Sequence, residues 1–66
     1  MKAQVNGEPR ELPDGLCIAT LLNLLGAPRN GIAIARNDTV VRRAEYDTQR
    51  IDEGDRIEII RAVAGG

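Results

Sequence analysis

The stretch that decides the fold is residues 18–26, which read IATLLNLLG. Its large apolar side chains recur at the spacing of one helical face: Ile18, Leu21, Leu22 and Leu25. Gly26 stands where helices commonly end on a left-handed residue, and Pro28 follows two positions later. We therefore expect one amphipathic helix from Ile18 to Leu25, and a helix this short needs a sheet to pack against.

The residues before this helix predict a hairpin. Apolar and polar residues alternate over residues 1–5, as in a strand with one buried face. Asn6-Gly7 follows, which is the strongest two-residue hairpin signal because both turn positions require positive φ. A second strand is expected from Glu8 to Leu12. Pro9 cannot donate a ladder hydrogen bond, so it should lie on an edge strand or at the start of a strand.

The residues after the helix predict three more strands. Residues 32–35 and 39–41 are apolar runs separated by the turn residues Asn37-Asp38, and the last strand runs from residue 56 to about residue 63. Residues 42–50 look irregular or briefly helical, with Tyr46 and Ile51 directed into the core. Strand alternation directs Ile57 and Ile59 to the inner face and Ile60 to the open face.

The resulting order is β-β-α-β-β-β, an α+β fold in which one main helix covers one face of a mixed β-sheet. The first and last strands should be adjacent and parallel. We expect a single domain over residues 1–66 whose core is thin, because so short a chain buries only about 60% of its surface. The side chains expected in the core include Val5, Leu21, Leu22, Leu25, Ile57 and Ile59.

Composition excludes several classes of function. The 66 residues contain no histidine, one cysteine, one aromatic residue and a net charge of −1. The usual general base and the commonest metal ligand are missing, so a self-contained enzyme and a metal site are not expected. Without a basic stripe or stacking aromatics, nucleic acid is not an expected partner. No apolar run approaches the ~20 residues of a membrane span, and the single cysteine fits a cytoplasmic location.

Two local features have a functional and a structural interpretation. Cys17 could be a persulfide site or a reactive nucleophile, but it has no histidine partner and no flanking lysine or arginine. We favour a small residue at the start of the helix. The carboxylates of Asp52, Glu53 and Asp55 could suggest calcium, yet they lack the spacing of a calcium-binding loop. A solvated turn is the favoured interpretation.

The chain ends in Gly65-Gly66 directly after the last predicted strand. Residues without a side chain form a thin segment that another protein can thread through a narrow channel, and the Gly66 carboxyl group is unhindered. The plain alternative is an unstructured chain end of no consequence. We expect the tail, about residues 64–66, to be flexible in the free protein.

Several short motifs, taken together, resemble the ThiS family of ubiquitin-like sulfur carriers. They are Val5-Asn6-Gly7, Ala35-Arg36-Asn37, Val41-Arg42-Arg43-Ala44-Glu45-Tyr46, Gly54-Asp55-Arg56-Ile57-Glu58-Ile59 and the terminal Gly65-Gly66. The sequence departs from the family pattern at two places, with Arg42 where proline and Tyr46 where tryptophan is usual. Both lie away from the tail and bear on the conformation of their own loop.

This resemblance implies a ubiquitin-like β-grasp fold and a sulfur carrier, not an enzyme, for the thiazole of thiamine. An E1-like, ThiF-type adenylyltransferase would use ATP to adenylate Gly66, and a cysteine desulfurase or rhodanese-like donor would convert it to a thiocarboxylate. A ThiG-type thiazole synthase would then receive the sulfur. The carrier itself would bind no cofactor and would be a monomer when free. Ala64, Gly65 and Gly66 would thread into partners, beside an interface formed by Ile60, Ala62 and Val63.

Two alternatives stay open on the sequence. One is a carrier of the same class that serves molybdopterin synthesis or tRNA thiolation. The other is a β-grasp binding module of the TGS type, which performs no covalent chemistry. Only the carriers need a free carboxyl group on Gly66.

Overall fold

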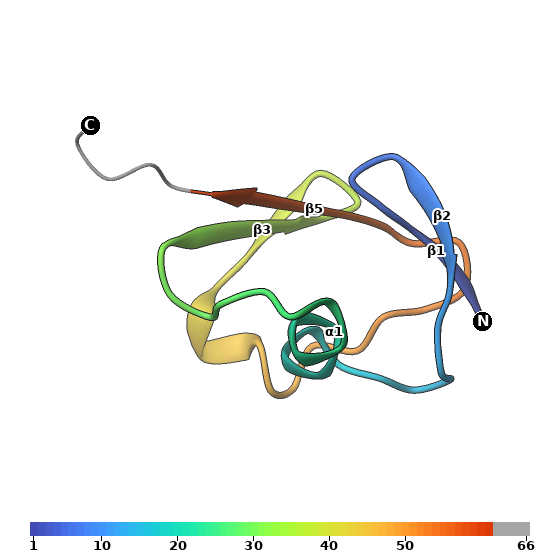
Figure 1. Cartoon of the computed structure of the whole chain (residues 1–66), viewed down its shortest axis with the longest axis horizontal. Coiled ribbons are helices and arrows are strands. Elements are labelled where there is room, and N and C mark those ends of the chain that lie inside the picture. Colours follow the sequence, from blue (N-terminus) through green and yellow to red (C-terminus); the bar gives the residue numbers. More distant parts are fainter. Residues whose placement is uncertain (62–66) are drawn as a thin grey trace.

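The computed structural model describes residues 1–61, which form a five-stranded sheet with one α-helix packed beneath it (Figure 1). The elements follow one another as β1 (Lys2–Val5), β2 (Glu8–Glu11), α1 (Ile18–Leu25), β3 (Ile32–Arg36), β4 (Thr39–Val41), the short 3-10 helix η1 (Arg43–Glu45) and β5 (Arg56–Arg61). The predicted order is confirmed. The part of the last strand predicted beyond Arg61 lies outside the described residues.

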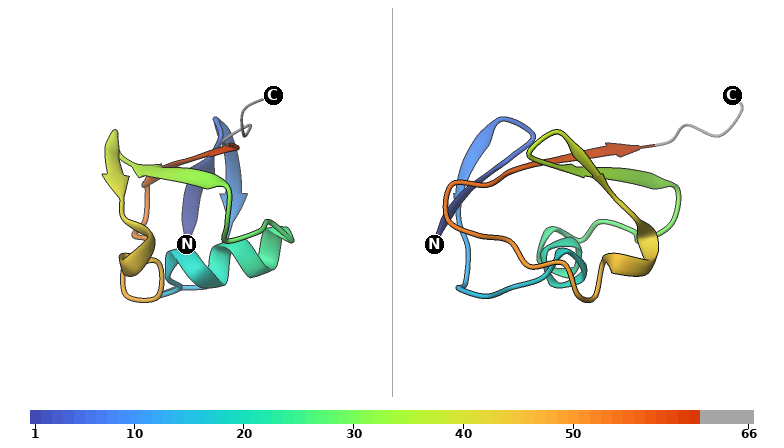
Figure 2. Two further views of the ribbon diagram at one scale, coloured as in Figure 1. Left: turned by 90° about the vertical axis from the view of Figure 1, so that its left-hand side faces the viewer. Right: turned by 180° about the vertical axis from the view of Figure 1, so that it is seen from behind.

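The strand order in the sheet is β2-β1-β5-β3-β4. The hairpins β1–β2 and β3–β4 are antiparallel, β5 is antiparallel to β3, and β5 runs parallel to β1. The first and last strands are therefore adjacent and parallel, as predicted. Figure 2 shows α1 and the segment around η1 together in a layer on one side of the sheet.

Both hairpin turns have the backbone that the sequence predicts. Asn6 and Gly7 have φ angles of 52° and 81°, and Asn37 and Asp38 have φ angles of 51° and 70°. All four residues are in the left-handed region, where Gly, Asn and Asp are best tolerated. Pro9 lies in β2 at the edge of the sheet, where its missing N–H breaks no ladder bond.

The helix begins and ends where the sequence predicts. Cys17 precedes it in an extended conformation without a side-chain cap, and Gly26 ends it with a φ of 67°. Ile18, Leu21 and Leu22 are fully buried. They meet side chains from the inner face of the sheet, which supplies the packing that so short a helix requires.

Among residues 1–61, thirteen apolar residues are less than a tenth exposed and form the core. They are Ala3, Val5, Leu12, Leu16, Ile18, Ala19, Leu21, Leu22, Ile34, Val41, Tyr46, Ile51 and Ile57. Two residues expected in the core, Leu25 and Ile59, are only partly buried and pack against its margin. Leu25 is less buried because it is the last residue of the helix. Ile59 is less buried because β1 stops pairing with β5 at Ile57, two residues earlier.

The irregular segment is held against the start of α1 by three backbone bonds. The N–H of Ile18 donates to the carbonyl of Gln49 at 3.0 Å, that of Ala19 to Tyr46 at 2.8 Å, and that of Ile51 to Leu16 at 3.0 Å. Tyr46 and Ile51 are buried, as predicted. Within residues 1–61, no helix has the length and apolar character needed to cross a membrane.

Candidate functional site

The residues predicted to carry the chemistry, Ala64, Gly65 and Gly66, lie outside the described part of the chain, as do the predicted interface residues Ala62 and Val63. The candidate site that the structure describes is therefore the surface directly before them. It consists of β5 and the open face of the sheet, which is the face opposite α1.

The open face carries an apolar patch, called here the outer-face patch. It consists of Ala33, Ala35, Val40 and Ile60. Ile60 lies directly opposite Ala33 across the β5–β3 ladder, and Val40 lies directly opposite Ala35 across the β3–β4 ladder. Directly opposed residues point to the same face, so the four side chains adjoin one another across three strands.

Two members of the outer-face patch are large and strongly exposed. Ile60 is 55% exposed and Val40 is 72% exposed. The exposure of Ile60 confirms the strand alternation, whereas its contact with a partner stays a prediction. Val40 was not singled out from the sequence, although alternation along Thr39-Val40-Val41 directs Val40 outward and Val41 inward.

Two asparagine side chains hold β5 in place. The N–H of Ile59 donates to Oδ1 of Asn6 at 2.8 Å, and the N–H of Arg56 donates to Oδ1 of Asn37 at 2.9 Å. The backbone N–H of each asparagine in turn donates to a backbone carbonyl of β5. That of Asn6 donates to Ile57 at 2.9 Å, and that of Asn37 donates to Arg56 at 2.8 Å. The residues that the sequence predicts only as turn formers therefore also fix the strand that leads to the tail.

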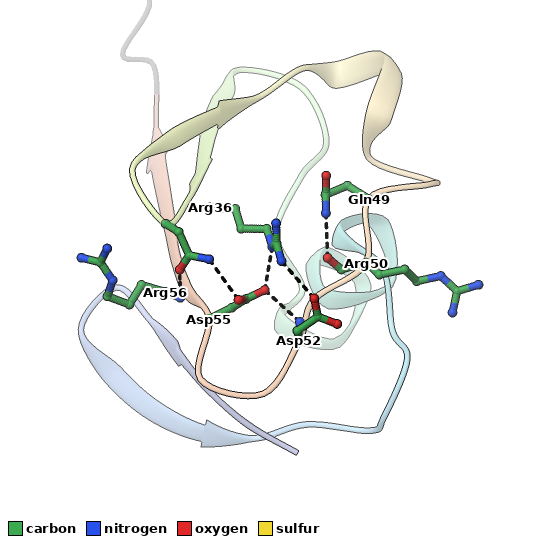
Figure 3. Close-up of polar contacts among 7 residues, drawn as sticks. Arg36, Gln49, Arg50, Asp52, Asp55 and Arg56 are labelled. Carbon is green, nitrogen blue, oxygen red and sulfur yellow. Dashed lines mark hydrogen bonds and ion pairs between the residues drawn. The ribbon is translucent and has the colours of Figure 1, made fainter.

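The acidic turn before β5 departs from the prediction of a solvated turn. Asp52 and Glu53 are exposed, but Asp55 is only 6% exposed. Its carboxylate accepts hydrogen bonds from Nε of Arg36 at 2.6 Å, Nδ2 of Asn37 at 3.0 Å and the N–H of Asp52 at 2.8 Å (Figure 3). A buried carboxylate needs such partners, and here it joins the end of β3 to the start of β5.

The pKa of Asp55 reflects this balance. Burial alone would raise the pKa, but the hydrogen bonds from Asp52, Asn37 and Arg36, together with the charge of Arg36, outweigh burial and hold it below its ordinary value. Arg36 also donates to Oδ2 of Asp52 at 3.1 Å. Asp55 is thus a structural anion that fixes the entry to β5.

Cys17 is half-buried at the start of α1, as the favoured interpretation has it. Its sulfur lies 3.4 Å from Oγ1 of Thr20, and this contact is the largest cause that lowers the pKa of the thiol. Among residues 1–61 no group of three or more His, Cys, Asp or Glu side chains is placed to hold a metal ion.

The strand order, the parallel pairing of β1 with β5 and the single covering helix define a ubiquitin-like β-grasp protein. The comparisons identify the branch of that class. The sequence model of the ThiS family matches residues 3–66, and the chain belongs to this family.

Solved structures and curated relatives agree with this assignment. A crystal structure of the thiamine biosynthesis protein ThiS from Geobacter metallireducens superposes with a TM-score of 0.87 at 26% identity, covering 100% of both chains. Over 66 residues, the chain is 32% identical to a thiazole synthase of Paramagnetospirillum magneticum and 36% identical to one of Magnetococcus marinus. It spans 20% of the length of each of these relatives.

Proposed function

We propose that this protein is the sulfur carrier of thiazole formation in thiamine biosynthesis, with sulfur carried as a thiocarboxylate on Gly66. The observation that carries the proposal is the extent of the family match, which runs from residue 3 through Gly65-Gly66. The family match therefore includes both the fold, from its first strand onward, and the residue that would be modified.

The first chemical step would be adenylation by an E1-like, ThiF-type enzyme. The Gly66 carboxylate attacks the α-phosphorus of ATP, and pyrophosphate leaves. The product is a mixed anhydride whose AMP is a good leaving group. Glycine suits this step because no side chain crowds the carbonyl carbon.

The second step would install the sulfur. A persulfide on a cysteine desulfurase or rhodanese-like donor attacks the Gly66 carbonyl and displaces AMP. A thiol then cleaves the S–S bond of the acyl disulfide, which releases the thiocarboxylate and leaves a disulfide behind. In neither step is a catalytic side chain of the carrier required, which agrees with its lack of histidine.

The sulfur acceptor in this proposal is a thiazole synthase. Two curated relatives bear that name, and in each the matched region is 20% of a longer chain. A carrier-like region within the same polypeptide as a thiazole synthase supports the proposal that the carrier binds a thiazole synthase. The likeness to proteins named for thiamine biosynthesis favours thiazole formation over molybdopterin synthesis and tRNA thiolation.

The fold supplies recognition in this account. β5 leads directly from the anchored segment at Asn6, Asn37 and Asp55 toward the tail. The outer-face patch lies beside its last residues and offers an apolar contact surface for the enzymes that receive the tail.

The test is reconstitution with an E1-like adenylyltransferase, ATP and a persulfide donor, followed by intact-mass measurement of the carrier. The proposal predicts an ATP-dependent gain corresponding to sulfur in place of oxygen, located on Gly66 by fragmentation. A chain that binds these enzymes but never gains sulfur would favour the non-covalent binding module.

A further inference from the structure

β5 is paired on both sides over only part of its length. On one side, β3 accompanies it as far as the pair Ile32–Arg61. On the other side, β1 pairs with it only at Gln4–Arg56 and Val5–Ile57, because the chain then turns away at Asn6-Gly7. Figure 1 shows the end of β5 continuing beside β3 past the β1–β2 hairpin.

The direction of the backbone groups along β5 follows from the bonds already described. Ile57 and Ile59 direct their backbone N–H and C=O groups toward the β1 side, where both residues bond to Asn6. Arg56 directs its backbone N–H and C=O groups toward Asn37 on the β3 side. Since these directions alternate along a strand, the next groups on the β1 side are the carbonyl of Ile59 and the N–H of Arg61. Within residues 1–61 neither of these groups has a hydrogen-bond partner.

The two outer edges of the sheet, unlike this part of β5, are protected against pairing with another strand. On β2, the positions that face outward are Pro9, which has no N–H, and Glu11. On the other edge, β4 is only three residues long. Short strands and proline are two of the means by which proteins prevent pairing at an edge. The inner edge of β5 has neither protection.

The space next to the start of this edge, at the turn where β1 ends, is open. A Cβ atom built on Gly7 would meet no atom within 4 Å. A hollow of about 420 Å³ lies just before the edge, where β1 leaves β5, and its lining includes Gly7, Ile57 and Glu58. Further along the strand, Ile60 presents an exposed apolar side chain to whatever lies next to it.

We propose that the free edge of β5, from the carbonyl of Ile59 to the N–H of Arg61, accepts a strand of the thiazole synthase that receives the tail. This proposal rests on the proposed function. The partner strand continues the position that β1 vacates and runs parallel to β5 toward residues 62–66. Main-chain pairing of this kind contributes affinity, and side chains beside the strand contribute specificity.

The parallel direction follows from the bond to Asn6. In a parallel ladder, one partner residue donates to the Ile59 carbonyl and accepts from the Arg61 N–H, so it satisfies both free groups. An antiparallel partner would reach the Ile59 carbonyl only by pairing with both the N–H and the carbonyl of Ile59. The N–H of Ile59 is already bonded to Asn6, so antiparallel pairing would have to break that bond.

The identity of the occupant follows from continuity with the tail. Any enzyme that acts on Gly66 must bind the chain end, which lies five residues after Arg61. Five extended residues span at most about 18 Å, so the surface of that enzyme lies close to the edge at Arg61. The thiazole synthase is chosen because two curated relatives carry that name.

The experiment compares Arg61→Pro with Arg61→Ala and Glu11→Pro for binding to the thiazole synthase of the same organism. Proline removes the N–H at position 61, whereas alanine removes only the side chain. Glu11→Pro removes an outward N–H from the opposite edge and serves as the matched control. Amide resonances of each free variant establish that it is folded.

We expect Arg61→Pro to bind about tenfold more weakly than Arg61→Ala, the effect of one hydrogen bond with good geometry, and Glu11→Pro to bind as the unaltered chain does. Equal binding by Arg61→Pro and Arg61→Ala, or equal weakening by both proline variants, would overturn the proposal.

A second measurement needs no variant. Hydrogen exchange at the Arg61 amide of the unaltered chain should slow at least tenfold in the complex, and unchanged exchange contradicts strand pairing. Sulfur loading of the same unaltered chain separates the two proposals. Loading with no effect at Arg61 overturns only the strand pairing, whereas a chain that neither loads sulfur nor binds thiazole synthase overturns both.

Discussion

Asn6 and Ile59 are 53 residues apart in the sequence, yet Oδ1 of Asn6 accepts the N–H of Ile59 at 2.8 Å. The side chain of a turn residue thereby occupies the place of a backbone carbonyl in the β1–β5 ladder. The same residue has a φ of 52°. Asn6 thus closes the first hairpin and also fixes the strand that precedes the tail.

Replacing Asn6 separates these two roles. Asn6→Gly keeps the left-handed backbone free of strain and removes only the carboxamide, so it should lower the free energy of unfolding by about 1 kcal/mol. Asn6→Ala adds the cost of a Cβ at positive φ, about 1 kcal/mol more. Urea unfolding measures both, and an alanine variant as stable as the glycine variant would contradict the backbone argument.

The buried carboxylate of Asp55 predicts how stability depends on pH. Its folded-state pKa lies below the ordinary value of about 3.9, so ionised Asp55 contributes stability at neutral pH. This contribution should be fully present well above pH ~4 and should be lost as the pH falls through the lower, folded-state pKa.

Asp55→Asn tests that assignment. The amide cannot accept from Arg36, Asn37 and the Asp52 N–H as the carboxylate does, so the variant should lose about 2 kcal/mol at neutral pH. The difference from the unaltered protein should shrink as the pH falls below about 4. Asp47→Asn is the control, because its exposed pair with Arg29 should contribute less than about 1 kcal/mol. A difference that stays constant between neutral and low pH is the contrary result.

The core prediction uses two isoleucines on the same face of β5. Ile57 is fully buried and Ile59 only partly, so Ile57→Ala should cost about 2–5 kcal/mol and Ile59→Ala distinctly less. In a chain this short, the larger loss approaches its whole stability. Thermal unfolding of the two variants gives the ranking, and the reverse order would refute the packing described for β5.

Local patterns predicted much of this fold, because each element carries its own signal. The helix bounds follow from the leucine spacing and Gly26, and the turns at Asn6-Gly7 and Asn37-Asp38 follow from residues that tolerate positive φ. Sequence could not reveal that Asp55 is buried, because its partner Arg36 lies on another strand. The partial burial of Ile59 likewise depends on where β1 ends.

The candidate site was predicted less completely. Alternation placed Ile60 on the open face, but the patch that it forms with Val40 depends on the strand order, which joins β5 to β4 through β3. The anchoring bonds from the Asn6 and Asn37 side chains are also tertiary. Gly66 itself was identified from family resemblance and from the unhindered carboxyl group, not from any packing pattern.

The outer-face patch can be tested with a matched pair of charge substitutions. Ile60 and Leu24 are similarly exposed, at 55% and 57%, but Leu24 lies on the helix, away from the open face. Ile60→Glu should weaken binding to the adenylyltransferase by about tenfold or more, since it buries a charge in an apolar contact, and Leu24→Glu should leave binding unchanged. Equal affinities of the two variants would show that the patch is not the contact surface.

The central claim concerns Gly66, and its most direct measurement is the intact mass of the chain after reaction with adenylyltransferase, ATP and a persulfide donor. The unaltered chain, a Gly66 deletion and a chain extended beyond Gly66 are compared. Their unfolding curves should coincide within about 0.5 kcal/mol, because both changes leave intact residues 1–61, whose side chains form the core described above. The account predicts that only the unaltered chain gains sulfur in place of oxygen, because only it presents the Gly66 carboxyl group. Sulfur gain by the deleted or extended chain would contradict it.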